Sequence, residues 1–319
     1  MPLVAEGRRP GRTALPTVIS ASRRTDIPAF YMPWFMAGVA RGYFTVENPF
    51  NHRQRRVPAG PQEVHTIVFW SKNFGPFLAG GYGQILRRQG YGLYFNFTLN
   101  STDRLLEPRL PPLADRLEQM DALAQAFGPA AVAWRFDPIC FYRDTGNVLH
   151  DNLADFERIA ARAGALGITR CITSFRDDYA KIKRRTAHLP GMAFLDPPIA
   201  RKAELLLSLE KSLTPRGIRL ETCCEAQVMA ALPPTSRSAP ANWIPGALLM
   251  GLYGGRVSGR RDGGQRVKKG CGCSLSADIG DYRRQPCFHN CLYCYAQPTA
   301  AAAPAAAAGQ GLGSPRQSC

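Results

Sequence analysis

The sequence predicts an α/β fold, a (β/α) barrel or partial barrel of about six to eight parallel strands. Two observations predict this class. Segments rich in β-branched and aromatic residues recur along the chain, and each is followed by a stretch with helical periodicity. Such alternation implies parallel strands joined by right-handed crossovers. In addition, no glycine-rich phosphate-binding turn follows the first strand, which favours a barrel over an open, doubly wound sheet.

The strands are predicted from short apolar runs that end in polar or charged residues. The run Gly92–Leu99 (GLYFNFTL) is typical, because aromatic residues dominate it and an asparagine follows. The predicted strands cover residues 17–20, 64–70, 92–99, 131–138, 169–175 and 218–225, and residues 242–246 are expected to be the remnant of one more. Residues 52–61 and 253–286 lack apolar periodicity and are predicted to be loops.

The helices are predicted from apolar residues at helical spacing. Leu113, Leu117, Met120 and Leu123 give the clearest stripe, and Pro215 marks the end of a later helix. The predicted helices cover residues 27–39, 77–88, 113–127, 151–167, a basic turn around 181–185, 197–213 and 226–232.

The composition suggests one domain between two irregular ends. Residues 1–16 are rich in Arg, Pro and Gly and are predicted to be a disordered leader. Residues 17–296 are predicted to form a single barrel-like domain, which includes a C-terminal Cys-rich segment at 271–296. Residues 297–319 are a low-complexity Ala/Pro/Gly tail, also predicted to be disordered.

The chain is strongly basic, with a formal net charge of +16 over 319 residues. This charge allows nucleic acid as a partner, although no motif of a known binding module is present. No signal peptide and no long apolar run are recognisable, so we expect a cytoplasmic protein without a membrane span. In that compartment cysteines stay reduced, which favours metal binding over disulfides.

Five of the ten cysteines lie between positions 271 and 294. Cys287, Cys291 and Cys294 have the spacing C-x3-C-x2-C, and Cys271 and Cys273 precede them. Clustered thiolates suit a soft metal, and three can hold a 4Fe–4S cluster by three of its irons. Zinc is an alternative, because His289 lies within the motif and completes a Cys3His set. A disulfide is the remaining alternative.

Charged residues follow nearly every predicted strand. In a parallel barrel the carboxyl ends of the strands form the active site, so we expect these side chains to share a pocket. The candidate catalytic and substrate-binding residues are Arg23, Arg24, Asp26, Lys72, Asp137 and Glu225. Arginine and lysine suit a carboxylate or phosphate, and the acidic residues suit an ammonium or ribose group. Arg135 and Asp137 are expected to form a structural ion pair.

Several motifs resemble the domain-of-unknown-function family numbered 1848. They are Ser20–Pro28 (SASRRTDIP), Val68–Asn73 (VFWSKN), Trp134–Pro138 (WRFDP) and the segment Cys271–Ala296. The spacing C-x3-C-x2-C, with Tyr293 before the last cysteine, also resembles the cluster loop of radical S-adenosylmethionine enzymes. In those enzymes the loop follows the first strand, whereas here it follows the last. In a closed barrel the last element lies beside the first, so a C-terminal cysteine loop could cover the same end of the barrel.

The resemblance implies a radical enzyme with a 4Fe–4S cluster and S-adenosylmethionine as cofactors. The cluster's open iron would bind S-adenosylmethionine, whose cleavage yields a 5′-deoxyadenosyl radical that acts on an unknown substrate. An electron donor such as flavodoxin or ferredoxin would then be a partner. Tyr293, Asp278 and Tyr282 belong to the matching segment and are expected to bind the cofactor.

Cys271 and Cys273 leave other interpretations open. If either binds the fourth iron, the cluster is closed and serves electron transfer or structure. Together with Cys223 and Cys224, they could instead hold a second metal. A zinc-stabilised protein that binds nucleic acid is the third hypothesis.

Overall fold

The computed structural model describes residues 15–48, 51–187, 189, 191–263, 265–266 and 269–296. Apart from residues 15 and 16, the predicted disordered leader lies outside the described residues. The predicted disordered tail at 297–319 lies outside them as well.

An eight-stranded sheet forms the centre of the molecule, in the order β12-β11-β9-β6-β5-β4-β1-β13. Each neighbouring pair is parallel. The strands are β1 (Thr17–Ala21), β4 (Val64–Ser71), β5 (Gly92–Thr98), β6 (Val132–Ile139), β9 (Arg170–Phe175), β11 (Arg219–Thr222), β12 (Ala239–Pro240) and β13 (Ala277–Asp278). The prediction of an α/β fold with parallel strands is confirmed. Among the described residues, no strand pairing joins β12 to β13, so a closed barrel is not observed.

One face of the sheet packs against helices, because inward residues of the strands and of the helices are apolar. Phe69 and Phe95 contact Phe77 of a helix, and Trp134 packs against Phe156 of another. The helices are α1 (Ile27–Phe30), α2 (Met32–Arg41), α3 (Gly75–Ala79), α4 (Tyr82–Arg88), α5 (Leu113–Phe127), α6 (Phe156–Ala165), α7 (Ala180–Thr186), α8 (Ile199–Leu213), α9 (Ala226–Ala230) and α10 (Gly246–Tyr253).

The opposite face of the sheet has a separate core. Alternate strand residues, among them Val18, Trp70 and Tyr94, point to this side and pack against residues 241–273. Trp243 and Leu249 of this later segment are buried there. The part of the chain after β11 therefore covers the face that the crossover helices leave bare.

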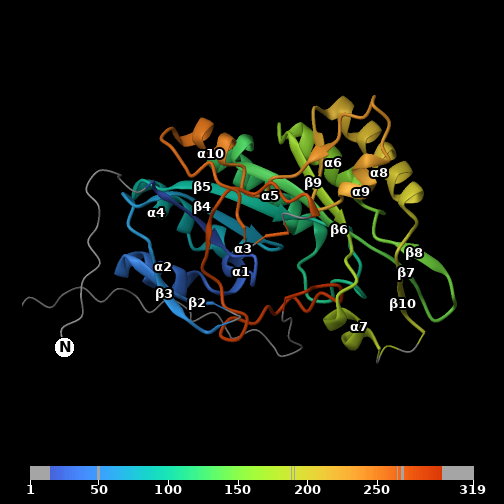
Figure 1. The fold of residues 1–319 in the computed structure, drawn as a ribbon, viewed down its shortest axis with the longest axis horizontal. Helices are drawn as coiled ribbons and strands as arrows, with labels where there is room; N and C mark the ends of the chain where they lie inside the picture. Colours follow the sequence, from blue (N-terminus) through green and yellow to red (C-terminus); the bar gives the residue numbers. More distant parts are fainter. Residues whose placement is uncertain are drawn as a thin grey trace, which may run out of the picture.

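Two small antiparallel sheets lie at opposite ends of the molecule (Figure 1). β2 (Tyr43–Glu47) pairs with β3 (Gln54–Pro58), and β7 (Phe141–Arg143) lies between β8 (Leu149–Asp151) and β10 (Ala193–Leu195). The prediction of a loop at residues 52–61 is therefore wrong for residues 54–58, which form β3. Only Val57 of this strand is buried, so its sequence carries no apolar run.

Other boundaries also differ from the sequence predictions. The helices expected at residues 27–39 and 77–88 are each divided in two, as α1 and α2 and as α3 and α4. The helix expected at residues 151–167 begins only at Phe156, because Asp151 ends β8. The strand remnant expected at 242–246 is found earlier, as β12, and Gly246 begins α10. The loop expected at 253–286 contains β13, whose two residues pair with β1.

No helix in the described part of the chain is both long and apolar enough to cross a bilayer.

Candidate functional site

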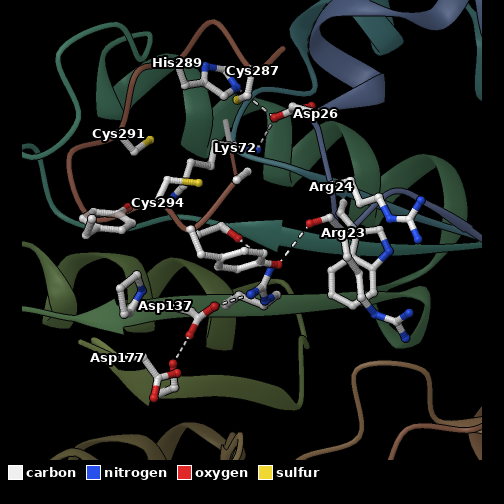
Figure 2. A pocket seen from close by; sticks show the side chains of 18 of the residues that line it. Arg23, Arg24, Asp26, Lys72, Asp137, Asp177, Cys287, His289, Cys291 and Cys294 are labelled. Carbon is white, nitrogen blue, oxygen red and sulfur yellow. Dashed lines mark hydrogen bonds and ion pairs between the residues drawn. The ribbon is translucent and has the colours of Figure 1, made fainter. Parts of the chain in front are cut away.

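A pocket opens at the carboxyl ends of the parallel strands, where the sequence analysis expected one (Figure 2). It encloses about 930 Å³, including its opening to solvent. The segment Cys287–Ala296, here called the cysteine loop, forms one wall. Cys287, Cys291 and Cys294 all line the pocket. The strand ends contribute most of the other lining residues, including Arg23, Arg24, Asp26, Lys72, Thr98, Arg135, Asp137, Ser174 and Asp177.

The cysteine loop is held by hydrogen bonds to its backbone. Arg185 of α7 donates to the carbonyl oxygens of Cys291, Leu292 and Cys294 over 2.8–3.0 Å. The hydroxyl of Tyr31 donates to Pro286 O over 2.7 Å at the start of the loop. Consistent with these contacts, the red C-terminal segment lies between the β2–β3 hairpin and α7 in Figure 1. The positions of the three cysteines are therefore set by elements far away in the sequence.

Asp26 connects the cysteine loop to the ends of β1 and β4. His289 Nε2 lies 2.8 Å from Asp26 Oδ2, and both side chains are buried. The carboxylate also accepts from Ala29 N, the hydroxyl of Ser71 and Lys72 N over 2.7–3.0 Å. Four residues thus occupy its oxygen atoms, and the geometry gives Asp26 a positioning role.

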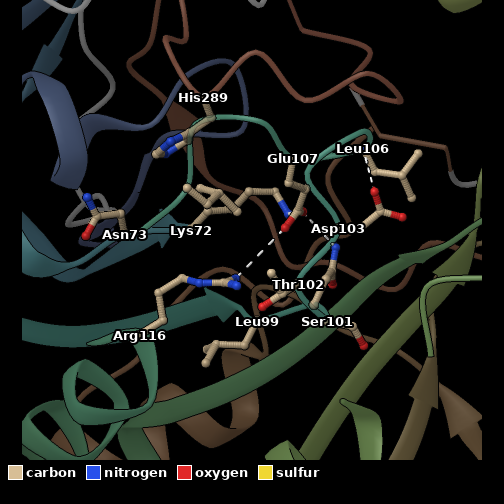
Figure 3. Close-up of polar contacts among 12 residues, drawn as sticks. Lys72, Asn73, Leu99, Ser101, Thr102, Asp103, Leu106, Glu107, Arg116 and His289 are labelled. Atoms are coloured by element: carbon tan, nitrogen blue, oxygen red, sulfur yellow. Dashed lines mark hydrogen bonds and ion pairs between the residues drawn. The ribbon is translucent and has the colours of Figure 1, made fainter. Parts of the chain in front are cut away.

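A buried ion network lies behind the cysteine loop (Figure 3). Lys72 Nζ donates to Glu107 Oε1 over 2.7 Å and to the hydroxyl of Tyr293 over 2.8 Å. Tyr293 and Asn100 also hydrogen-bond to Glu107, and Arg116 Nη1 lies 3.9 Å from Glu107 Oε2. The network ties the tyrosine of the cysteine motif to β4 and to helix α5.

The charges of this network stabilise one another. Burial alone would lower the pKa of Lys72, but Glu107 and Cys291 outweigh it and hold the pKa above its usual value. Burial would raise the pKa of Glu107, but Lys72 and Arg116 hold it below its usual value. Lys72 therefore stays cationic beside Cys291, where it favours a thiolate.

Cys291 is buried, Cys287 and Cys294 are partly buried, and burial raises the pKa values of all three thiols. Cys287 and Cys294 raise the pKa of Cys291 further, so the three groups lie close enough to interact electrostatically. Thiolates in such surroundings form when a metal replaces the proton. Within the described residues, no group of three or more Cys, His, Asp or Glu side chains is arranged to hold a metal ion.

Arginines and an aspartate form the opposite side of the pocket. Arg135 forms the expected ion pair with Asp137, and its guanidinium lies 4.4 Å from the ring centroid of Trp243. Asp137 also accepts from the hydroxyl of Ser174. The Nε atom of Arg135 is buried and has no hydrogen-bond partner among the described residues. One cationic donor of this wall is therefore available to a ligand.

The remaining arginines of the predicted set are bound to protein groups. Arg23 lies over the ring of Trp70 and 3.5 Å from Asp262. Arg24 donates to Gly280 O over 3.0 Å and lies 3.8 Å from Asp278. Both line the pocket, and these contacts join Arg23 to the segment that covers the sheet and Arg24 to β13 and the following Gly280.

Five predicted site residues do not line this pocket. Glu225 lies in a neighbouring cavity with Lys202 and Asp177, and burial raises its pKa to about 7. Asp278 accepts from Ser20 and Ser22 and so fixes β13 to β1.

The other three residues lie near by, but in different surroundings. Tyr282 lines an adjacent hollow with Arg24. Cys271 and Cys273 lie in the buried cluster that Cys223 and Cys224 also join, whereas Cys291 and Cys294 belong to a different one.

Sequence reasoning missed the role of Glu107 and Arg116. Glu107 lies in a loop and Arg116 lies on the apolar stripe of α5, so neither follows a strand. Arg116 could have been recognised from the sequence, because it is a charged residue at a position that helical periodicity places in the core. A buried charge of this kind indicates a buried partner. His289 was considered only as a metal ligand, because its partner Asp26 is 263 positions away.

Comparison with known families agrees with the motifs in the pocket wall. Residues 18–296 match the family described as Domain of unknown function (DUF1848). The chain belongs to this family. The match covers the central sheet and the cysteine loop, so the family's extent is the extent of the domain described above. No curated protein and no solved structure matches the chain.

Proposed function

We propose that this protein is an iron–sulfur enzyme of the radical S-adenosylmethionine type. The observation that carries the proposal is the position of Cys287, Cys291 and Cys294. The three thiols line one pocket at the carboxyl ends of the parallel strands. That is where an α/β sheet of this kind places its chemistry. Their spacing fits three ligands of a 4Fe–4S cluster with one iron left open.

The residues around the thiols fit such a cluster. Lys72 supplies positive charge next to Cys291. Arg185 fixes the carbonyl groups of the loop, so the backbone needs no rearrangement to present the thiols. Cys271 interacts with Cys224 and Cys273, and neither Cys271 nor Cys273 lines the pocket, so neither is positioned to bind the fourth iron of a cluster there. This favours an open iron over a cluster closed by four cysteines.

With S-adenosylmethionine bound, the cluster would supply the electron that releases a 5′-deoxyadenosyl radical. The protein's own residues would bind and orient the reactants. Arg135, with an unpartnered Nε, is suited to a carboxylate or another anion. Asp137 and Ser174 are suited to a hydroxyl or ammonium group on the same side of the pocket. An electron donor such as flavodoxin or ferredoxin is a required partner of this proposal.

Electron paramagnetic resonance tests the proposal. The full chain is purified without oxygen, reconstituted with iron and sulfide, reduced, and measured with and without S-adenosylmethionine. We expect a 4Fe–4S signal that changes when S-adenosylmethionine is added, because the open iron gains ligands. Single Cys287→Ala, Cys291→Ala and Cys294→Ala variants should lose the cleavage of S-adenosylmethionine.

Cys171→Ala is the control, because Cys171 is a buried cysteine of β9 that does not line the pocket. This variant should keep the signal and the cleavage. A 4Fe–4S signal that does not change when S-adenosylmethionine is added would indicate an electron-transfer or structural cluster. A colourless protein with zinc in the pocket would contradict both cluster hypotheses and leave the basic, nucleic-acid-binding alternative.

A further inference from the structure

Four cysteines outside the pocket form a second group. Cys223 and Cys224 directly follow β11, and Cys271 and Cys273 lie in the segment that covers the sheet. The Sγ atoms of Cys223 and Cys224 are 3.4 Å apart. Cys271 and Cys273 lie in the same buried cluster as Cys223, and Cys224 packs against that cluster. Electrostatic interaction between Cys224 and Cys271 and between Cys271 and Cys273 is consistent with this proximity. Two segments about fifty residues apart in sequence thus bring four thiols into one cluster.

The backbone is shaped to bring these thiols together. Successive side chains of an extended strand point to opposite faces. Cys224 interrupts this alternation because its φ is 64°, a left-handed conformation that residues other than glycine rarely adopt. Its thiol consequently lies beside that of Cys223 rather than opposite it. A costly conformation at a cysteine indicates a constraint that the rest of the fold maintains.

The loop that carries the other two thiols is also closely fitted. Gly272 separates Cys271 from Cys273, and a Cβ atom at this position would lie 2.0 Å from the side-chain amide of Asn242. Only glycine allows the loop to approach that closely. Cys273 O accepts from Asp262 N, and Ser274 N donates to Ile244 O, both over 3.0 Å. The position of the second thiol pair is therefore fixed by the surrounding backbone.

Two arginines place positive charge beside the group. Arg23 interacts electrostatically with Cys273, and Arg266 with Cys223 and Cys224. The Arg23 side chain is 7% exposed, and its Nε and Nη2 atoms lack partners among the described residues. Buried N–H donors without acceptors are costly. Thiolate sulfur atoms of Cys273 and its neighbours are the acceptors that this guanidinium lacks.

We propose that Cys223, Cys224, Cys271 and Cys273 bind a single zinc ion through four thiolates. At a zinc–sulfur distance of 2.3 Å, tetrahedral geometry separates the sulfur atoms by about 3.8 Å. The Sγ atoms of Cys223 and Cys224 already lie 3.4 Å apart, and Cys271 and Cys273 belong to the same buried cluster. A change of rotamer moves a cysteine Sγ by about 3 Å, enough to point all four at one centre. A 4Fe–4S cluster is larger and would hold its cysteines further apart.

The zinc would have a structural role distinct from the pocket. It would link the end of β11 to the segment that covers the second face of the sheet. That segment leads directly to β13 and to the cysteine loop. Zinc at this site would therefore hold the cover in place independently of any cluster in the pocket.

Metal analysis of a pocket variant separates the two sites. In the Cys287→Ser/Cys291→Ser/Cys294→Ser variant of the full chain, grown with zinc, we expect stoichiometric zinc and no iron. Adding Cys271→Ser should release the zinc, whereas adding Cys171→Ser should not. Cobalt in place of zinc should give the absorption of a tetrahedral thiolate complex. Zinc-free protein, or iron with sulfide at this site, would overturn the assignment.

A second measurement on the unaltered chain covers the case in which the Cys271 variant does not fold. The folded protein is alkylated before and after zinc removal with a chelator, and the modified cysteines are identified by mass spectrometry. We expect all four cysteines to be protected until the chelator is added. Equal labelling before and after, or a disulfide between Cys224 and Cys271, would contradict the proposal.

Discussion

Asp26 illustrates how one buried side chain can organise a site without touching a substrate. Its carboxylate caps α1 through Ala29 N, holds the end of β4 through Ser71 and Lys72, and fixes His289 in the cysteine loop. A carboxylate accepts all of these hydrogen bonds because it has no N–H groups of its own. Three separate segments therefore depend on one side chain.

Replacing Asp26 with Asn should destabilise the fold and loosen the cysteine loop. The amide nitrogen cannot accept from Lys72 N, so we expect a loss of about 2 kcal/mol in the free energy of unfolding. Urea denaturation measures this loss. Asp155→Asn is the control, because Asp155 accepts one backbone N–H from Thr102 and an amide oxygen can replace it. Equal stability of the two variants would show that Asp26 does not hold these segments.

Glu225 should make stability depend on pH. Burial raises its pKa from 4.5 to about 7 in the folded protein. Because the folded state holds the proton more tightly than the unfolded state, its contribution is complete below about pH 4.5 and is lost as the pH rises through about 7. Gln mimics the protonated form, and its amide oxygen can still accept from Phe175 N. Glu225→Gln should therefore match the wild type near pH 4.5 and be more stable near pH 8.

Thermal unfolding across this range tests the prediction. Glu118→Gln on the exposed surface of α5 serves as the control and should follow the wild type at every pH. A Glu225→Gln variant whose melting temperature runs parallel to that of the wild type would show that Glu225 does not take up a proton on folding.

At the scale of single residues, the sequence predicted well which side chains line the pocket. It predicted less well what each side chain does there. Arg23, Arg24 and Lys72 could be found because each follows a strand, and Asp137 because it lies near the carboxyl end of β6. Parallel strands end at a common edge. Their partners could not be found, because the pairing of Lys72 with Glu107 depends on how a loop folds back. Long-range contacts of this kind leave no periodic signal in a sequence.

Packing between elements explains why some glycines of this chain are required and others are not. Gly38 lies in α2 where the helix crosses β2, and an added Cβ would lie 2.1 Å from Phe44 Cε1. Gly251 lies in α10, and no atom lies within 4 Å of the position of an added Cβ. The two positions share a helical backbone but differ in what surrounds them.

Alanine should therefore have opposite effects at the two positions. Gly38→Ala should destabilise the protein by about 1–3 kcal/mol, because the buried Phe44 ring has no room to move. Gly251→Ala should stabilise it by up to about 1 kcal/mol, because alanine favours the helical backbone. Denaturant titration of both variants measures the difference. Stabilisation by both substitutions would mean that the contact between α2 and β2 is loose.

Elements with a strong local pattern were predicted, and those fixed by distant partners were not. The stripe of Leu113, Leu117 and Met120 identified α5 within its observed bounds. β13 escaped prediction because its two residues become a strand only by pairing with β1. α10 escaped because it is apolar on nearly all sides, so its sequence has no amphipathic period.

Considered as a whole, the molecule uses the two faces of one sheet differently. The crossover helices, built from local sequence, cover one face. The segment after β11, which includes α10, covers the other face, carries Cys271 and Cys273, and leads to the cysteine loop. The pocket thus joins side chains from the strand ends with thiols from the last part of the domain, and it depends on the sheet being complete.

The pairing of β13 with β1 has a consequence for the order of synthesis. β1 is among the first strands to leave the ribosome, yet Ser22 and its partner Asp278 are 256 positions apart. The outer edge of β1 therefore remains without its strand partner until nearly the whole domain has been translated. An unpaired edge is a site for association between nascent chains. The segment that closes this edge also leads to the three pocket cysteines, so the pocket is completed only when the edge of the sheet is already protected.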